Sequence, residues 1–302
     1  MIVGKRRRRG LIGVLSQFGM LIGLGTALIL LLAVFSFLHP IGDSFAVIQI
    51  PLAMFGLLFA VLAWPAWLRV LLAAVAGLAL VQVGLTYMER EPAGPVKIYQ
   101  KNLLQSNNRT PEVLRDLRAI DPEVVTLQEM STQLFDSWKA EADNYTTRHF
   151  CANSHGVGSA ILTKWPEVAG SGFCHADGKF AALQVKTPEG PLWLVSLHLN
   201  WPWPYEQGWQ VPLITRDLLG LGGPILIGGD FNNMPWSSAV TRIAEAAGGR
   251  RAGGVKPTLY LFSLPMPIDN VIAPGGGRIE TRPTFCSDHL GLVGRVSLRS
   301  GQ

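Results

Sequence analysis

The N-terminal part of the chain contains three long stretches without a charged side chain. Each reaches the roughly 17–25 apolar residues that are needed to cross a bilayer core of about 30 Å. They help to explain why only 16% of all residues are charged, whereas about 25% is usual in a soluble domain. The stretches are residues 11–38, 44–68 and 70–88, and only Asp43 and Arg69 interrupt them.

These stretches predict three transmembrane helices, over residues 11–38, 45–64 and 68–88. A cleaved signal peptide is the alternative for the first stretch, but its 28 uncharged residues exceed the usual hydrophobic region of about 7–15 residues. Pro51 and Pro65 leave another alternative, in which two helices span the membrane and the second stretch is re-entrant.

A basic cluster at the N-terminus predicts the orientation. The chain has 26 Lys and Arg against 21 Asp and Glu, and the cluster Lys5–Arg9 supplies the whole excess of +5. Because basic residues mark the cytoplasmic side, we expect residues 1–10 in the cytoplasm and everything after Met88 outside it. This predicts a multi-pass protein of the cell membrane, or of the inner membrane in a Gram-negative cell, with a periplasmic or extracellular domain. Nuclear targeting or RNA binding is the alternative for the cluster.

The rest of the chain predicts one globular domain. Residues 89–95 are polar and Pro-rich, which indicates a linker, and residues 96–302 contain many short strands with few helices. This pattern favours an α+β layered sandwich over a doubly wound parallel sheet. A helix is expected over 112–120, with Thr110 as its N-cap and Pro111 at its first position. Further helices are expected over 207–219 and 237–247, and strands over 96–103, 124–129, 158–163, 181–186, 192–199, 224–228, 270–273 and 290–298.

Polar and acidic side chains follow these strands or cluster near the C-terminus. Taken singly, each has an ordinary explanation, such as a solvated carboxylate, a turn or a structural histidine. Taken together they predict an acid-rich pocket, and oxygen ligands of this kind suit a hard cation such as Mg²⁺ or Mn²⁺. The set is Asn102, Glu129, His198, Asn200, Asp230, Asn232, Asp269, Asp288 and His289.

The order of these motifs resembles the endonuclease/exonuclease/phosphatase superfamily, which includes DNase I-like nucleases, apurinic endonucleases, neutral sphingomyelinases and inositol-polyphosphate 5-phosphatases. The resemblance covers nearly all of residues 96–298 and implies a four-layer α/β sandwich with its site at one end of two packed sheets. The matching segments are Lys101-Asn102, Leu127-Gln128-Glu129, Gly156–Leu162, Ser196-Leu197-His198, Gly229-Asp230-Phe231-Asn232, Asp269-Asn270-Val271 and Ser287-Asp288-His289.

The resemblance implies a role for each matching residue. Glu129 corresponds to the principal ligand of Mg²⁺ or Mn²⁺, with Asn102 and Asp288 as further ligands.

The remaining roles concern the phosphate and the attacking water. Asp230 would orient or deprotonate the water, and Asn232 would hold a phosphate oxygen. Asp269 would orient and charge His289, which would stabilise the phosphorane or protonate the leaving group. His198 would contact the scissile phosphate. Such in-line attack builds negative charge that a cation and two imidazoles can neutralise.

Two features depart from the apurinic endonucleases. Those enzymes carry an acidic residue two positions after the Asn, and this chain has Leu104 there. No Tyr stands where those enzymes place one near the phosphate. Both differences argue against a role in intracellular DNA repair.

An aromatic segment follows His198. With Asn200, the side chains of Trp201 and Trp203 are candidates for substrate binding, and Tyr205 and Trp209 lie just beyond them. They could stack on bases or sugars or dip into the membrane interface. The alternative is a rigid loop that packs on the edge of the sheet.

The three cysteines suggest one disulfide. In an oxidising compartment Cys151 and Cys174 could bridge across the predicted hairpin around Gly156–Trp165. The alternative is a pair of free, buried thiols. Cys286 is expected to be a small packing residue.

The sequence therefore predicts a membrane-anchored, extracytoplasmic phosphodiesterase that depends on a divalent metal and acts by in-line attack of water. Nucleic acid is the favoured substrate, and a nuclease the favoured class. Outside Lys5–Arg9, however, basic and acidic residues balance, so no polyanion-binding field supports this choice strongly. A phospholipid or sphingomyelin head group is the alternative substrate. A non-catalytic, membrane-tethered binding module is the alternative function, and no protein partner is indicated.

Overall fold

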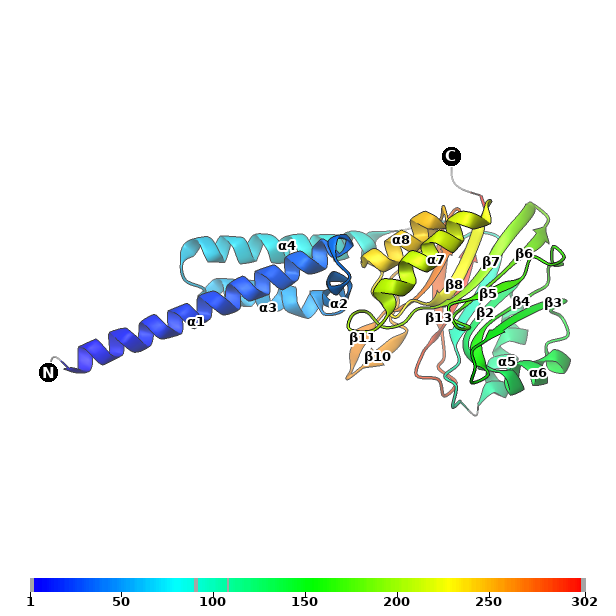
Figure 1. The fold of residues 1–302 in the computed structure, drawn as a ribbon, viewed down its shortest axis with the longest axis horizontal. Coiled ribbons are helices and arrows are strands. Elements are labelled where there is room, and N and C mark those ends of the chain that lie inside the picture. The colour runs from blue at the N-terminus through cyan, green and yellow to red at the C-terminus, as the bar shows by residue number, and fades with distance from the viewer. Residues whose placement is uncertain (1–2, 90–91, 108, 300–302) are drawn as a thin grey trace. The chain divides into compact units, whose positions relative to one another are not determined.

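A computed structural model describes residues 3–89, 92–107 and 109–299, with side chains from Ser16 onward except that of residue 140 (Figure 1). The chain divides into two compact units, Met1–Thr86 and Tyr87–Gln302.

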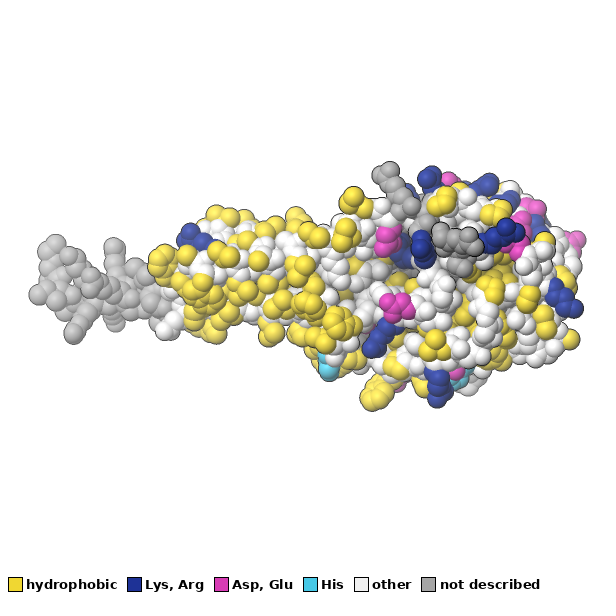
Figure 2. Space-filling model, turned by 90° about the horizontal axis from the view of Figure 1, so that it is seen from above, with side chains coloured by type: hydrophobic (Ala, Val, Ile, Leu, Met, Phe, Trp, Pro, Cys, Tyr) yellow, Lys and Arg dark blue, Asp and Glu magenta, His cyan; other side chains and the backbone are white. Residues whose placement is uncertain are grey.

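The first unit is helical. Two of its helices are long and apolar enough to cross a membrane, within Ser16–Val34 and over Ala66–Met88. Only 28% and 33% of these windows are buried inside the protein, and Figure 2 shows many apolar side chains on the face of this unit that is in view. The elements are α1 (Val3–Val34), the short 3-10 helix η1 (Ser36–Leu38), α2 (Ile41–Val47), α3 (Gln49–Leu62) and α4 (Ala66–Met88).

The second expected helix, over 45–64, is not continuous. α2 and α3 meet at Ile48 with a bend of 76°. Pro51 explains the break, because its ring lacks an N–H and clashes with the carbonyl four residues earlier, at Val47, where α2 ends. The described part of the helical unit thus offers two candidate spans, or three if the bent pair crosses as one.

The second unit is a mixed α/β sandwich of two packed sheets, as the sequence predicts, and each of these sheets has six strands. The first sheet has the order β13 (Gly277–Arg282), β14 (Gly291–Val296), β1 (Val96–Asn102), β2 (Val124–Ser131), β4 (Val157–Thr163), β3 (Thr147–Ala152). The second has the order β5 (Phe173–His175), β6 (Phe180–Thr187), β7 (Gly190–His198), β8 (Ile225–Asp230), β12 (Asp269–Ala273), β9 (Arg250–Arg251). A separate hairpin joins β10 (Leu259–Leu261) to β11 (Leu264–Met266).

Apolar side chains from both sheets meet in a central core, which includes Ile98 and Val124 from one sheet and Leu194 and Leu226 from the other. Two pairs of helices cover the outer faces. α5 (Thr110–Ile120) and α6 (Thr132–Glu141) pack on the first sheet, and α7 (Gln207–Leu221) and α8 (Ser238–Ala246) pack on the second.

The start of α5 differs from the expectation. Thr110 is already helical, and Arg109 occupies the N-cap without a side-chain hydrogen bond. Asn107 provides the turn into the helix, because its Oδ1 accepts the backbone N–H of Arg109 at 2.8 Å. The structure also contains short elements that the sequence does not predict, namely α6, β3, β5, β9, β10, β11 and β13.

A disulfide joins the edges of the two sheets. Cys151 lies in β3 and Cys174 in β5, and their sulfur atoms are bonded at 2.06 Å. Cys286 is exposed, so the expectation that it packs inside is wrong. Residues 285 and 286 both have positive φ, and this turn points the Cys286 side chain to solvent.

Candidate active site

Strand register brings the predicted site residues together. β1 and β2 are parallel, with Asn102 beside Gln128, and β7 and β8 are parallel, with His198 beside Asp230. β12 runs antiparallel to β8 and places Asp269 opposite Asp230. Polar residues that are far apart in the sequence therefore converge at one end of the sandwich.

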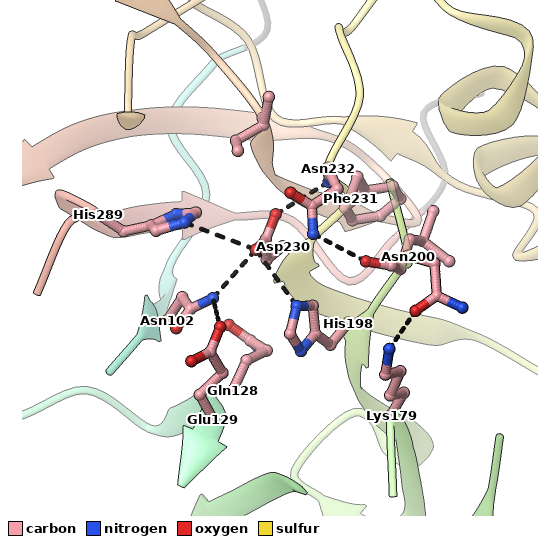
Figure 3. A network of polar contacts seen from close by, with 12 residues as sticks. Asn102, Gln128, Glu129, Lys179, His198, Asn200, Asp230, Phe231, Asn232 and His289 are labelled. Atoms are coloured by element: carbon pink, nitrogen blue, oxygen red, sulfur yellow. Dashed lines mark hydrogen bonds and ion pairs between the residues drawn. The ribbon is translucent and has the colours of Figure 1, made fainter. Parts of the chain in front are cut away.

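Asp230 lies at the centre of this cluster (Figure 3). It is only 1% exposed, and its Oδ2 accepts a hydrogen bond from Nδ2 of Asn102 at 3.0 Å. The Nε2 atoms of His198 and His289 lie 3.6 and 3.7 Å from the same oxygen. The backbone N–H of Asn232 donates to Oδ1 at 2.9 Å. One carboxylate thus faces two imidazoles, an arrangement suited to moving a proton.

An irregularity in β2 aims Glu129 at the cluster. The register between β2 and β4 shifts between Leu127 and Met130, and Glu129 has a left-handed φ of 54°. Such a bulge redirects a side chain that regular alternation would send elsewhere. Oε1 of Glu129 accepts from Nδ2 of Asn102 at 3.0 Å, and Oε2 accepts the backbone N–H of Gln105 at 3.1 Å.

Asn102 links the two carboxylates. Its Nδ2 donates to both Glu129 and Asp230, while its Oδ1 accepts the backbone N–H of Leu104 at 3.0 Å. Only Oδ1 can coordinate a cation, so Asn102 would have to turn its amide over to act as the expected ligand. In the orientation present here it holds the two carboxylates at a fixed separation.

His289 and Asp269 form a buried pair. Nδ1 of His289 lies 2.8 Å from Oδ2 of Asp269, and Oδ1 of Asp269 accepts from Nε2 of Gln100 at 2.9 Å. The backbone N–H of Asp269 donates to Oγ1 of Thr258 at 3.1 Å. Because Asp269 engages Nδ1, the Nε2 atom of His289 is left facing Asp230.

The charges in this cluster shift its pKa values. Burial alone would lower the pKa of His289, but the carboxylates of Asp269 and Asp230 raise it to about 10. Burial works to raise the pKa of Asp269, yet the charge of His289 holds it below its ordinary value. For Asp230, burial outweighs the attraction of His289 and raises the pKa. The buried pair is therefore an imidazolium and a carboxylate, and Asp230 is the better proton acceptor of the two acids.

The turn that carries Asp288 is tied to β1. Oγ of Ser287 donates to the backbone carbonyl of Asn102 at 2.8 Å and accepts the N–H of His289 at 3.0 Å. Asp288 is exposed. It lines the same open cleft of about 550 Å³ as Glu129.

The other predicted residues lie around this cleft. Asn232 lines it, and its Nδ2 donates to the carbonyl of Leu199 at 2.8 Å; an amide nitrogen carries a second hydrogen that can hold a phosphate oxygen. Asn200 also lines the cleft and accepts from Nζ of Lys179. Trp201 is half-buried in the wall, whereas Trp203 is exposed and is not among the lining residues.

Sequence reasoning missed a buried polar chain beneath the site. Gln100 donates to Oε1 of Gln128 at 2.8 Å, and Gln128 donates to Oγ of Ser196 at 3.0 Å. All three are fully buried. The sequence carries one signal of this chain, which is a polar residue at an inward-facing position of an apolar strand. Such a residue is buried and needs a hydrogen-bond partner. Lys179 precedes β6 and carries no comparable signal.

Two groups of side chains could hold a cation. Glu129, Asp230 and Asp288 present carboxylate oxygens to the cleft, which fits a hard cation. Ligand atoms of Asp230, Asp269 and His289 lie within 4.8 Å of one another. Asp269, however, already uses one oxygen for His289 and the other for Gln100. The second group therefore fits proton transfer better than cation binding.

Part of the second unit matches a known protein family. Residues 100–289 match the model of the endonuclease/exonuclease/phosphatase family. No curated protein sequence matches the chain.

Three solved structures illustrate the similarity of fold. A D. rerio TDP2 complexed with single-strand DNA product is 14% identical, has a TM-score of 0.53 and covers 66% of this chain and 97% of its own. An endonuclease/exonuclease/phosphatase from Bacteroides vulgatus is 16% identical, with a TM-score of 0.52 and coverage of 66% and 97%. The endonuclease domain of TRAS1, a telomere-specific non-LTR retrotransposon, is 16% identical, with a TM-score of 0.52 and coverage of 68% and 99%.

The matched segment contains Asn102, Glu129, Asp230, Asp269 and His289, and thus the whole central cluster. The chain belongs to the endonuclease/exonuclease/phosphatase family, whose members are metal-dependent phosphoric ester hydrolases.

Proposed function

We propose that the chain is a membrane-anchored phosphodiesterase whose catalytic domain lies outside the cytoplasm and depends on Mg²⁺ or Mn²⁺. The observation that carries this proposal is the position of Asp230, whose Oδ2 faces Asn102, His198 and His289 at the wall of one open cleft. Hydrolysis of a phosphodiester needs a base for water and positive charge for the phosphoryl oxygens, and this cluster supplies both.

Each residue has a role that its contacts support. Asp230 accepts the proton of the attacking water, because burial raises its pKa and makes it the more basic acid. His289, charged and oriented by Asp269, stabilises negative charge on the phosphoryl group. His198 and Asn232 hold phosphoryl oxygens from the cleft wall.

Glu129 is the first candidate to hold the cation. Asp288, from the turn before His289, would be a second ligand, and Asn102 would be a third after rotation of its amide. A bound Mg²⁺ or Mn²⁺ would supply positive charge that polarises the phosphoryl oxygen. Carboxylate and amide oxygens are the ligands that both cations prefer.

The apolar helices support the membrane anchor. They include two to three candidate spans, and the basic cluster Lys5–Arg9 at the start of α1 favours a cytoplasmic N-terminus. If three helices span the membrane, the catalytic domain lies on the side opposite to the cytoplasmic N-terminus. If only two span it, the catalytic domain would remain in the cytoplasm.

Nucleic acid and lipid head groups are both candidate substrates. The D. rerio TDP2 structure with single-strand DNA product supports the first, and a membrane anchor supports the second.

The experiment that tests this proposal uses the full-length protein in detergent with bis(p-nitrophenyl) phosphate. We expect hydrolysis in Mg²⁺ or Mn²⁺ that stops in EDTA and returns when the metal is restored. Hydrolysis that persists in EDTA would contradict the proposed mechanism.

A further inference from the structure

The β10–β11 hairpin projects from the body of the catalytic unit (Figure 1). Its tip exposes large apolar side chains: Phe262 is 94% exposed, and Tyr260, Leu261 and Leu264 are exposed as well. No charged residue occurs between Leu259 and Met266. A soluble protein seldom holds a contiguous apolar group of this kind in water, so such a group indicates a binding surface.

The base of the same hairpin is part of the active site. Leu259 lines the cleft and forms a β-bridge with His289. Thr258 lies just before Leu259. Its Oγ1 accepts the backbone N–H of Asp269 at 3.1 Å, and its backbone carbonyl accepts the N–H of Leu290 at 2.7 Å. The hairpin therefore extends directly from the catalytic pair to the surface.

A second segment, residues 203–209, carries exposed aromatic side chains and borders the cleft. Tyr205 lines it and is exposed, and Trp209, which is 82% exposed, lines an adjoining cavity of about 410 Å³. The two cavities share Lys179, Asn200 and Glu206. Tyr and Trp are the residues that favour the interface between bilayer and water.

The charge of the cleft does not suit a long polyanion. Among the described residues that line it, Lys179 is the only Lys or Arg, against the acidic Glu129, Glu206, Asp230 and Asp288. A bound cation would offset part of this negative charge. Proteins that bind nucleic acid contact the flanking phosphates with several Lys or Arg side chains, and this cleft offers one.

The tether keeps the catalytic domain near the anchor. α4 ends at Met88 and β1 begins at Val96, so the linker spans at most about 30 Å. A linker of this length keeps the catalytic domain close to any bilayer that holds α4.

We propose that the β10–β11 hairpin and residues 203–209 dock on the bilayer surface, and that the cleft hydrolyses a phosphoester of a membrane lipid. This inference rests on the proposed function and narrows its substrate to the lipid class. The apolar tip, the interfacial aromatic residues and the presence of Lys179 as the only Lys or Arg among the described lining residues all favour a lipid head group over an extended polyanion.

The first test compares three substrates with full-length protein. They are bis(p-nitrophenyl) phosphate, single-stranded DNA, and vesicles of phosphatidylethanolamine, phosphatidylglycerol, phosphatidylinositol and sphingomyelin into which the protein is reconstituted, with lipid loss measured by mass spectrometry. Phe262→Asp should lower lipid hydrolysis by about tenfold or more, because a charge at the tip opposes insertion. Hydrolysis of the soluble diester should stay within about twofold, since Phe262 lies outside the cleft.

Leu219→Asp is the matched control, because Leu219 is 68% exposed on α7 and belongs to neither of the two proposed docking segments; it should leave both rates unchanged. The soluble diester also reports whether each variant folds. If wild type hydrolyses none of the three substrates, the proposed function fails. If it hydrolyses the soluble diester and DNA but no lipid, or if Phe262→Asp does not affect lipid hydrolysis, this inference alone is overturned.

The second test measures directly how deeply the tip of the β10–β11 hairpin inserts into the bilayer. A fluorophore on Phe262→Cys, in a background with Cys286→Ser, should be quenched by lipids that carry a spin label near the head group. The same fluorophore on Leu219→Cys should not be. Equal quenching at the two positions would overturn docking.

Discussion

Nδ1 of His289 lies 2.8 Å from Oδ2 of Asp269, and both side chains are buried at the end of the sandwich. The second oxygen of Asp269 accepts a hydrogen bond from Gln100, so the carboxylate is fixed on both sides. This contact determines which nitrogen of the imidazole faces Asp230, and thus prepares His289 to act on a phosphoryl group.

Asp269→Asn should lower kcat by about 10²- to 10⁴-fold, because the amide neither charges His289 nor fixes its tautomer. The measurement is steady-state hydrolysis of bis(p-nitrophenyl) phosphate. Asp217→Asn is a matched control, since Asp217 also contacts a histidine, His175, and does not line the cleft. An equal loss in both variants would contradict a special role for Asp269.

The stability of the metal-free protein should depend on pH through His289. Its folded pKa is raised to about 10 from 6.5, so the folded state binds more protons between these values. The resulting stability is fully present below pH 6.5 and is lost as pH rises toward 10. In EDTA, the thermal unfolding temperature of His289→Gln should therefore fall less with rising pH over this range than that of wild type. Lys101 and the tyrosines are present in both wild type and His289→Gln, so they do not account for a difference between the two. Parallel plots of unfolding temperature against pH would therefore contradict the raised pKa of His289.

Glu129→Gln should weaken cation binding by about tenfold or more, because a charged oxygen ligand is lost. Titration of Mn²⁺ followed by electron paramagnetic resonance measures the affinity without needing activity. Glu206→Gln is the matched control, since Glu206 is another carboxylate of the cleft wall to which no cation is assigned. Unchanged Mn²⁺ affinity in Glu129→Gln would remove Glu129 as the principal ligand.

The topology can be tested with reporters fused after Gln302. Alkaline phosphatase, which is active only after export, should be active in the fusion, and green fluorescent protein should not fluoresce after export through the general secretory route. This result is expected if the bent pair α2–α3 crosses the membrane as one span. The opposite pattern would indicate two spans and a cytoplasmic catalytic domain.

The sequence predicts the sandwich well, because its central strands are apolar runs that end in turn residues. The ends of β1, β2, β7 and β8 all lie within two residues of their predicted positions. These strands carry at their ends residues that meet in the site. The β10–β11 hairpin escapes prediction, because its exposed apolar side chains do not alternate with polar ones.

The finer geometry of the site depends on contacts between distant segments. Glu129 reaches the cluster only through a bulge, and local propensity does not reveal where a register shifts. Gln100 supports Asp269 from a different sheet, and Pro51 breaks a helix that hydropathy alone predicts as continuous. Each of these outcomes follows from the tertiary structure or from one backbone restriction, and not from the average character of the segment.

The most direct test of the account is the Mg²⁺-dependent hydrolysis rate of bis(p-nitrophenyl) phosphate by wild type and Asp230→Asn, both as full-length protein in detergent. The substitution keeps the shape of the side chain and removes the base that faces both imidazoles, so we expect a loss of about 10²-fold or more in kcat. The thermal unfolding temperature of each protein shows that the fold is intact. A folded Asp230→Asn variant with the wild-type rate would contradict the assignment of this cluster as the catalytic site.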